Sequence, residues 1–565
     1  VSLFEKFFVT LQTEIENMHN FNYMRHAGNI FLVALAVLMV ACSSRELNTK
    51  TSNTTGWNYF DEKTTNFEAI EGVGNVNPVG MVAIQGGTFT IGENDEFVTA
   101  PRNNARRSLT VSSFYMDKYE VSNLNWREYT HWMGVVFGSS APELVRAALP
   151  DTTVWREEMA YNEPYEQYYF RHPAFSFYPV VGVTWEQAMD YCSWRTDRVN
   201  ELALIQSGNI AIPNFADLEP TYEDDVRNDW EEMHPGYYMD DKEVVNPEDP
   251  TTTTTLYTVP FEYIRDQFVF NTAKYLYSDQ YNPEFGKKPK TDMYGNDRKV
   301  NRADGILVVG YRLPTEAEWE FAAFAPIAGE DGLTIEGKLY PWQGYHPRNL
   351  NKKGRGQFQA NFVRGRGDMM GTSGNLNDHY VITAPVDEYD PNDFGLYNMA
   401  GNVNEWVLDV YRETTNQETS EYNSFRGNIY MKPVTEVNED GKTVYVLDSL
   451  GRVKTTWASE DDKRDWKDGD FASLIDTDYP LDTVAALNLL GEGEGSIKYD
   501  PTDILAPRIT KNTRVYKGGS WKDRIYWLNP TTRRFLDQNQ AMSTIGFRCA
   551  MSTVGNQIEN GSEKK

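Results

Sequence analysis

Alternating apolar and polar residues predict several short β-strands. Residues 81–92 alternate on both sides of Gly86-Gly87, which predicts two strands around a glycine turn. The same alternation predicts a strand in residues 109–119 and a hairpin in residues 434–447, where an Asn-Glu-Asp-Gly turn stands in the middle. Loops are predicted where composition is biased, in residues 237–250, 251–255 and 491–495.

Three stretches have helical spacing and a residue suited to begin a helix. Ser122 is the predicted N-cap of a helix that runs to Met133, and Thr184 precedes a helix in residues 185–200. Thr315 and Glu318 have capping-box spacing at the start of a third helix. Few helices among many short strands and turns predict an irregular α+β domain.

The long apolar run in residues 30–41 is too short for a transmembrane helix, which needs ~20 residues. It follows a basic start at Met24-Arg25 and ends in the small residue Ala41, a pattern typical of a signal peptide. We therefore expect residues 24–41 to be a signal peptide. The alternative is a buried hydrophobic helix.

The residues at the end of this run resemble a bacterial lipobox, Met39-Val40-Ala41-Cys42, in which the cysteine is acylated. Cys42 is then the lipid-bearing first residue of the mature chain. Residues 1–23 would precede the true start, as a start-site artefact, and residues 42–77, which are polar, would form a tether.

Composition and charge narrow the function. The 565-residue chain has 40% hydrophobic and 13% aromatic residues, which excludes intrinsic disorder and coiled-coil or collagen-like classes. Its net charge of −28 would repel a phosphate backbone, so we expect no nucleic-acid partner.

The sequence lacks the common metal-binding and nucleophile motifs. The seven histidines form no His-Glu-x-x-His or His-x-His pattern, and neither a P-loop nor a Gly-x-Ser-x-Gly elbow occurs. Cys192 and Cys549 lie in aromatic surroundings, and in an exported protein they are either a disulfide or two buried thiols.

One segment has the oxygen donors that calcium prefers. Residues 398–406 contain Asn398, a glycine at position 401 and Glu405, while nitrogen and sulfur donors are scarce there. The pattern predicts either a calcium site or a turn before a strand from Trp406 to Tyr411.

Seven motifs together resemble the sulfatase-modifying, formylglycine-generating enzyme family, whose irregular, C-type-lectin-like α+β fold is then expected. They occur in the family's order and are Gly86-Gly87-Thr88-Phe89, Tyr178-Pro179-Val180-Val181 leading to Trp185, the segment 311–320 with Arg312-Leu313-Pro314-Thr315-Glu316, Tyr340-Pro341-Trp342, the segment 395–406 with Asn398-Met399-Ala400-Gly401-Asn402, Gly518-Gly519-Ser520-Trp521 and Gly546-Phe547-Arg548-Cys549.

The resemblance implies that the catalytic chemistry is lost. The family's enzymes have two copper-binding cysteines after the Gly-Gly-Ser-aromatic motif, and this chain has Asp523 and Leu528 there. Neither side chain can replace a thiolate. We expect no oxidase activity and no copper or iron.

The resemblance also implies structural features. It implies a disulfide between Cys192 and Cys549 and two structural calcium sites. The first would use Asn361, the Phe362 carbonyl, Asp378 and the Tyr380 carbonyl, and the second would use Asn398, the Gly401 and Val403 carbonyls and Glu405.

The family domain would occupy residues 78–555 and would be followed by a polar tail, residues 556–565. Three insertions, at about residues 134–177, 195–310 and 412–511, interrupt it. Insertions this long are usually functional or disordered, and these are rich in aromatic residues that suit interfaces.

An exported lipoprotein with such a domain resembles the gliding-motility and type IX secretion lipoproteins of the Bacteroidetes, the GldK/PorK type and its GldJ relative. The resemblance implies a periplasmic protein, anchored to the outer membrane, that forms a homo- and hetero-oligomeric ring with a GldN/PorN-type partner and other type IX secretion components. Because net charge −28 opposes self-association, ring formation should need the partner.

Two alternatives predict different outcomes. An oxidase or oxygenase of the formylglycine-generating family with a relocated metal site predicts redox metal and oxygen consumption. A glycan- or peptidoglycan-binding module predicts retention on those polymers.

Overall fold

The computed structural model describes eleven ranges of the chain. They are residues 51–59, 78–93, 103–213, 224–245, 253–326, 338–365, 378–411, 431–437, 443–446, 453–457 and 512–554, except residues 53, 278–280, 282, 293–294, 343, 351 and 353. The predicted signal peptide, Cys42, residues 1–23 and the tail 556–565 lie outside these ranges, as do residues 491–495.

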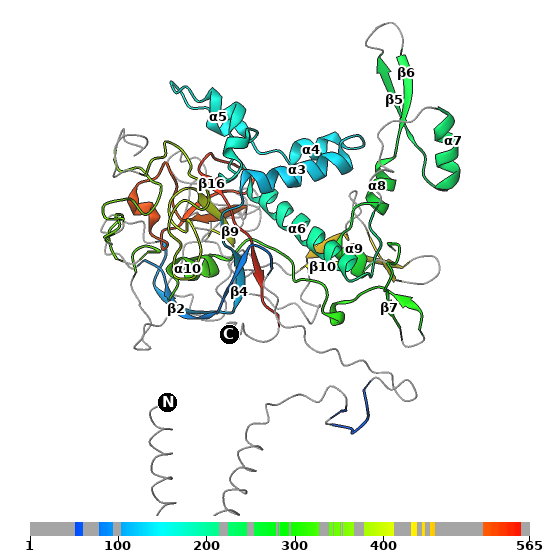
Figure 1. The fold of residues 1–565 in the computed structure, drawn as a ribbon, viewed down its shortest axis with the longest axis horizontal. Helices are drawn as coiled ribbons and strands as arrows, with labels where there is room; N and C mark the ends of the chain where they lie inside the picture. The colour runs from blue at the N-terminus through cyan, green and yellow to red at the C-terminus, as the bar shows by residue number, and fades with distance from the viewer. Residues whose placement is uncertain are drawn as a thin grey trace, which may run out of the picture. The chain divides into compact units, whose positions relative to one another are not determined.

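A four-stranded sheet lies at the centre of the domain (Figure 1). Its order is β15 (Arg534–Asp537), β14 (Thr513–Lys517), β9 (Asn404–Val410) and β16 (Ile545–Gly546). β14 is antiparallel to both neighbours, and β16 runs parallel to β9. The sheet joins residues more than 100 positions apart, and β9 is buried almost throughout.

A second sheet joins the two ends of the described domain. It contains β1 (Met81–Ile84), β4 (Phe114–Asp117) and β17 (Ala550–Ser552). β2 (Gly87–Ile91) pairs with β3 (Arg107–Val111) in a separate two-stranded sheet.

The strands on either side of Gly86 are therefore present but do not pair with each other. At Gly86 the chain crosses the end of β3 so closely that a Cβ atom would lie 2.2 Å from the Val111 carbonyl oxygen. The prediction of one strand over residues 109–119 is wrong, because the chain breaks at Ser112-Ser113 opposite Gly86, and β3 and β4 belong to different sheets.

The three predicted helices are confirmed. α3 (Asn123–Phe137) has Ser122 as its N-cap, and α6 (Trp185–Gln206) has Thr184. α10 (Glu316–Phe324) begins with the predicted Thr315 capping box and is buried along its whole length. α3 and α6 continue beyond the predicted ends because their later turns pack against the inserted region.

Two apolar clusters form the core of the family domain. One contains Trp126, Tyr191, Trp406 and Phe547, and the other packs Trp319 of α10 against β2, β3 and β9. Trp126, Trp319 and Trp406 are fully buried. The mixture of short strands, helices and irregular chain confirms the predicted α+β class.

The inserted region contains more regular structure than predicted. Residues 237–255 were expected to be loops, but β5 (Asp240–Val245) pairs with β6 (Thr253–Thr258). Helices α7 (Asp224–Met233), α8 (Phe261–Gln267) and α9 (Thr272–Tyr277) accompany this hairpin. Threonine-rich strands are stable here because α7, α8 and the end of α3 provide the hydrophobic cover that the hairpin lacks by itself.

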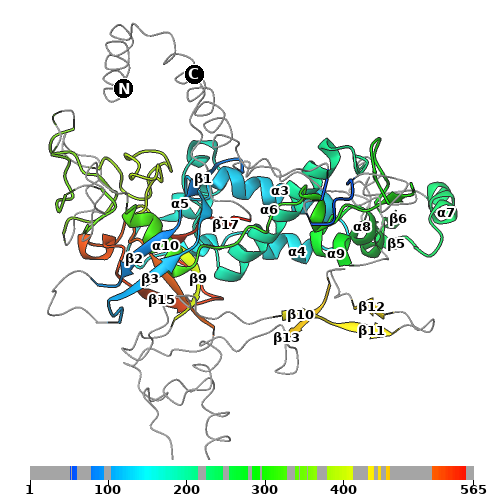
Figure 2. The same cartoon turned by 90° about the horizontal axis from the view of Figure 1, so that it is seen from below.

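The remaining elements are short. They are α4 (Pro142–Ala147), η1 (Thr152–Trp155), α5 (Glu163–Tyr168), η2 (Pro173–Phe175), β7 (Lys290–Thr291), β8 (Asp297–Arg298), η4 (Arg302–Asp304), β10 (Met431–Pro433), β11 (Thr435–Val437), β12 (Thr443–Tyr445), β13 (Thr455–Trp457) and η5 (Ile525–Leu528). β11 pairs with β12, which confirms the predicted hairpin (Figure 2). Within the described residues, no helix combines the length and the hydropathy needed to cross a membrane.

Candidate functional site

Asp523 lies on the turn that follows β14, and Leu528 is the last residue of η5. The Asp523 carboxylate accepts one hydrogen bond of 2.7 Å on each oxygen from the Arg534 guanidinium. The Ser520 hydroxyl donates to the same carboxylate at 2.6 Å, and the Asn404 amide donates at 3.3 Å. Asp523 therefore joins the turn to β9 and β15.

The electrostatics of this group keep the Asp523 carboxylate charged at neutral pH. Burial acts to raise the pKa of Asp523, but hydrogen bonds from Arg534 and its positive charge outweigh burial and hold the pKa below its usual value. A carboxylate whose lone pairs are taken by Arg534, Ser520 and Asn404 is a structural clamp, and such a group is poorly suited to accept a proton near neutral pH.

Leu528 faces an apolar cluster. It is fully buried with Phe358, Phe362 and Ala400. The two positions that the resemblance assigns to metal-binding cysteines thus hold an ion-paired carboxylate and a buried isobutyl group, neither of which is a soft metal ligand.

Cys192 of α6 and Cys549, just before β17, are brought together from opposite ends of the domain. Their sulfur atoms lie 3.6 Å apart, and both residues are fully buried. Burial, with Cys192 beside it, raises the pKa of the Cys549 thiol well above its usual value. A disulfide requires the sulfur atoms to approach to ~2.05 Å, and it stays a prediction.

Asn398 and Glu120 form a buried polar contact that the sequence did not indicate. The Asn398 amide donates to the Glu120 carboxylate at 3.1 Å and to the Val386 carbonyl at 3.2 Å. Its own oxygen is buried without a hydrogen-bond partner. The Asn402 amide also donates to Glu120, at 2.7 Å.

Glu120 is fully buried, and its charge is costly there. Burial, followed by repulsion from Glu405, raises the pKa of Glu120 to about 8, while Arg548 opposes this shift. The Asn398 oxygen, which is buried without a hydrogen-bond partner, is the atom here that a hard cation could satisfy.

Glu405 has a different environment from the one expected of a simple calcium ligand. Its carboxylate accepts two hydrogen bonds from Arg548, at 2.6 and 2.7 Å, and one from the Trp319 indole at 2.7 Å. Both members of the ion pair are almost fully buried. Glu405 thereby fixes β9 against α10 and the Arg548 segment, and its role as a calcium ligand stays a prediction.

The two predicted calcium sites adjoin each other. The backbone N–H of Asn402 donates to the backbone carbonyl of Asn361 at 3.0 Å, and a Cβ atom at Gly401 would lie 2.5 Å from the same carbonyl oxygen. Gly401 also has a positive φ of 79°, so both the clash with the Asn361 carbonyl and the left-handed backbone conformation disfavour any larger residue. The Asn361 side chain donates to the Ile382 carbonyl at 2.7 Å, which draws residues 378–382 toward it.

The donors in this region suit calcium better than a transition metal. Asn361, Asp378 and Asn398 are all at least nine-tenths buried and offer oxygen atoms. Within the described residues, no group of three or more His, Cys, Asp or Glu side chains is arranged to hold a metal. Backbone carbonyls and amide oxygens would have to complete the site, as is usual for calcium.

A cleft of about 220 Å³ opens beside these residues. Aromatic side chains (Trp342, Tyr389) and acidic groups (Asp378, Glu388) line it, together with Asn398. An aromatic surface with nearby carboxylates and amides can stack against and hydrogen-bond a polar ligand.

The structure adds three residues that the sequence reasoning missed. They are Glu120, Arg534 and Arg548. No local pattern singles out Glu120, because Asp117 and Lys118 precede it within three residues. Arg534 and Arg548 meet carboxylates more than ten residues away along the chain, so no local pattern reveals them.

Residues 66–553 match the family model described as "Sulfatase-modifying factor enzyme 1-like domain". The mouse protein named formylglycine-generating enzyme is 23% identical over 352 residues, which are 58% of this chain and 58% of that protein. The Streptomyces coelicolor formylglycine-generating enzyme is 40% identical over 105 residues, 19% of this chain and 28% of that one. A bovine relative named "Inactive C-alpha-formylglycine-generating enzyme 2" is 36% identical over 104 residues, 18% of this chain and 28% of the relative.

The similar solved structures are distant. PvdO from Pseudomonas aeruginosa aligns at 15% identity with a TM-score of 0.35, covering 84% of this chain and 94% of PvdO. Treponema denticola variable protein 1 aligns at 15% identity with a TM-score of 0.33, covering 84% and 95%. The chain spans 58% or less of the curated relatives described above.

Proposed function

This chain belongs to the sulfatase-modifying factor enzyme 1-like family, and from that premise we propose that it is a non-catalytic structural member of the family. One observation carries this proposal: Asp523 is clamped by Arg534 and Leu528 is buried in an apolar cluster. No third cysteine can take over, because Cys192 and Cys549 lie against each other and Cys42 is the predicted lipid anchor.

Metal loading and oxygen consumption test the loss of activity. The purified chain is incubated with Cu(I) and a cysteine-containing peptide, with the Streptomyces coelicolor formylglycine-generating enzyme as the positive control. We expect neither stoichiometric copper nor oxygen uptake, because two thiolates are needed to hold the metal. Bound copper together with peptide turnover would favour the oxidase with a relocated site.

The structural role that we propose is in the type IX secretion and gliding-motility machinery. The lipobox-like segment before Cys42 and the three aromatic-rich insertions support a lipid-anchored periplasmic protein that works within an assembly. A partner of the GldN/PorN type would reduce the repulsion between copies and allow a ring.

Imaging and cross-linking of cell envelopes test this role. We expect ring-shaped particles that contain this chain and a second protein, and loss of the chain should stop secretion of type IX substrates. Replacing Cys42 with alanine should release the protein from the outer membrane. Normal secretion in cells that lack the chain would contradict the proposal.

We also propose that calcium has a structural role next to β9. The buried Asn398 oxygen and the Glu120 carboxylate beside the Asn398 amide nitrogen support one calcium site. Asn361 and Asp378, which lie nearby, would belong to the second calcium site. Calcium would supply positive charge to carboxylates that are otherwise buried at a cost.

The cleft beside the calcium region supports one further candidate function, glycan binding. Trp342 stacks on Tyr340 with ring centroids 4.9 Å apart, and the Trp342 side chain lines the cleft. Retention on peptidoglycan that is lost in Trp342→Ala would favour this function, and equal retention of both proteins would exclude this cleft.

A further inference from the structure

Residues 224–268 form an arm that carries an excess of negative charge. We call it the acidic arm. It consists of α7, the β5–β6 hairpin and α8, and it has its own apolar cluster around Trp230, Tyr257 and Ile264, which packs on the end of α3. The arm is therefore a folded unit with a surface of its own (Figure 1).

The arm has twelve acidic residues and three basic residues, a net charge of −9. Exposed carboxylates include Asp229, Glu232, Asp241 and Glu262. Of the three basic residues, Arg227 is already paired with Glu231 at 3.1 Å. The arm therefore carries roughly a third of the chain's net charge of −28.

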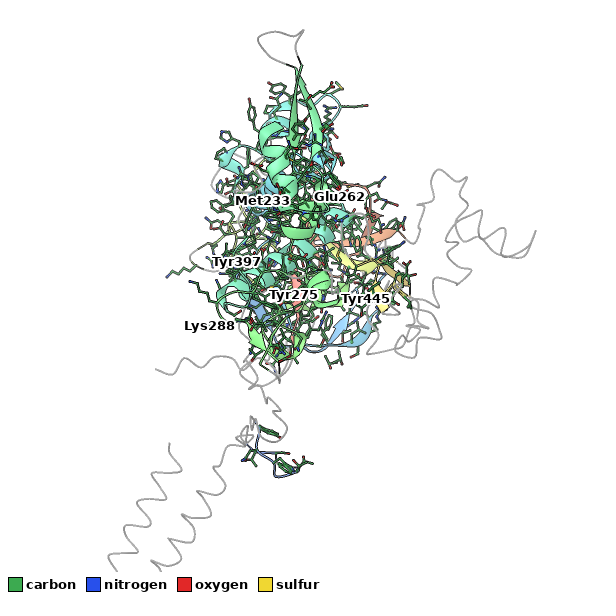
Figure 3. The ribbon with its side chains drawn as sticks, turned by 90° about the vertical axis from the view of Figure 1, so that its right-hand side faces the viewer. Met233, Glu262, Tyr275, Lys288, Tyr397 and Tyr445 are labelled. Atoms are coloured by element: carbon green, nitrogen blue, oxygen red, sulfur yellow. The ribbon has the colours of Figure 1, made fainter. Side chains whose placement is uncertain are left out.

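The same surface also exposes apolar groups. Met233 at the end of α7 is 69% exposed, and Tyr238 is 72% exposed. Figure 3 labels Met233 of α7 and Glu262 of α8 within the arm. Within the described residues β5 and β6 pair only with each other, so the hairpin also has open edges. Apolar groups among charges are typical of protein interfaces.

A second segment of the chain has the opposite character. Residues 344–365, which we call the basic loop, contain five basic residues and no acidic residue. Lys352 and Arg355 are exposed, and the loop also exposes Tyr345 (70%) and Leu350 (62%). In a chain of net charge −28, a sequence segment of net charge +5 is unusual.

The arm and the loop belong to different parts of the domain. The arm's apolar cluster contains residues from α3, α4 and the arm, whereas Phe358 and Phe362 of the loop pack with Ala400 and Leu528. Figures 1 and 2 both show the loops that follow α10 on the other side of β9 from α7. The apolar cluster of the arm and the apolar cluster of the basic loop have no residue in common.

We propose that the acidic arm of one copy of this chain binds the basic loop of the next copy. The contact is heterologous, so each pair still offers one arm and one loop, and addition of copies leads to a closed ring or an open filament. This inference rests on the proposed function in a ring and identifies the surfaces that join neighbouring copies.

Charge also sets the strength of this contact. Opposite charges, −9 on the arm and +5 on the loop, steer two copies into one orientation. The remaining negative charge still repels, so the copy-to-copy contact is weak and salt-sensitive without a partner protein.

Charge-reversal variants of the detergent-solubilised full chain test the proposal by mass photometry and sedimentation. The arm variant is Glu232→Lys/Glu262→Lys, and the loop variant is Lys352→Glu/Arg355→Glu. Each should weaken self-association by about tenfold or more, and raising the salt should weaken that of the unmodified chain similarly. An equimolar mixture of the two variants should recover part of the association, because the unchanged loop of the arm variant can bind the unchanged arm of the loop variant.

A matched control reverses two exposed carboxylates outside the arm, Glu128→Lys/Glu158→Lys, and should leave association within about twofold of the unmodified chain. A chain that stays monomeric at low salt, or arm and loop variants that associate normally, would overturn the inference. So would association only after addition of another protein that binds the arm. If rings in cell envelopes persist in both variants, this contact is refuted but the proposed function stands. If the purified chain associates in a charge-dependent way but envelopes contain no rings, the contact stands and the proposed function is refuted.

Discussion

The β9 region and the acidic arm use charge in opposite ways. Around β9, charged side chains are buried and paired: Lys517, with no exposed surface, contacts Glu320 at 2.9 Å, and Arg548 holds Glu405. In the arm, Glu232 and Glu262 are exposed and concentrated with other carboxylates. The two regions belong to one chain but face different physical demands.

The difference separates architecture from recognition. A buried charge must be paired or the fold loses several kcal/mol, so the β9 network holds the strands in one arrangement. An exposed charge contributes little to folding and stays available to another molecule. Mutations in the first region should therefore affect stability, and mutations in the second should affect association.

Removal of Arg548 should have the largest effect on stability. Arg548→Met leaves Glu405 buried without its ion pair and should lower the free energy of unfolding by about 3–5 kcal/mol. Urea titration measures the change. The matched control is Arg156→Met, which breaks a pair of equal length whose arginine is 69% exposed and should lower the free energy of unfolding far less, because water already screens that pair. Equal losses in both variants would remove the distinction between buried and exposed charge.

Calcium removal should have the next largest effect. If calcium occupies the region around Asn398, chelation should lower the free energy of unfolding by about 2–3 kcal/mol relative to calcium at a hundred times its Kd. Asn398→Leu should reduce that difference, while Asn228→Leu on exposed α7 should not. A stability that is the same with calcium and with chelator would contradict the proposed site.

Asp523→Asn should have an intermediate effect that depends on pH. Loss of the charge opposite Arg534 should cost about 1–3 kcal/mol at pH 7. Because the folded-state pKa of Asp523 is below its unfolded value, this stabilisation is fully present above pH ~3.9 and disappears as the pH falls through the folded pKa. The difference between variant and unmodified chain should shrink as the pH falls below ~3.9. A pH-independent difference would indicate that hydrogen bonding alone is responsible.

Reversal of a single arm charge should have the smallest effect. Burial, followed by repulsion from Glu262 and Asp241, raises the pKa of Asp240. Glu262→Lys removes one of these repulsions and should change the free energy of unfolding by about 0.5 kcal/mol or less, toward greater stability. Glu262→Gln should give a smaller change of the same sign. A large destabilisation would mean that Glu262 has a structural role within the arm.

Local sequence signals were reliable where they act on neighbouring residues. The caps at Ser122, Thr184 and Thr315 were predicted correctly because an N-cap bonds within three residues of itself. The β11–β12 hairpin was predicted for the same reason. Gly86 and the 109–119 stretch were misread, because pairing there is decided by segments that cross each other.

The candidate site was only partly predictable. The segment from Asn398 to Glu405 was identified by its oxygen donors and glycine, and the structure brings Asn361 next to it. Glu120 could not be assigned because it reaches Asn398 from a position 278 residues away in the chain. The family resemblance identifies Asp523 as the position of a lost cysteine. It does not predict the pairing with Arg534, because that pairing depends on the register of β14 and β15.

Residue identity and short-range spacing are enough to reveal the family, the helix starts, the acidic excess and the concentration of opposite charges in two segments. Tertiary structure decided which carboxylates are buried and paired, that Cys192 meets Cys549, and that the arm and the loop lie in separate clusters. Burial and long-range pairing depend on the whole packed chain, since the energy of a charge is set by the dielectric and the partners around it.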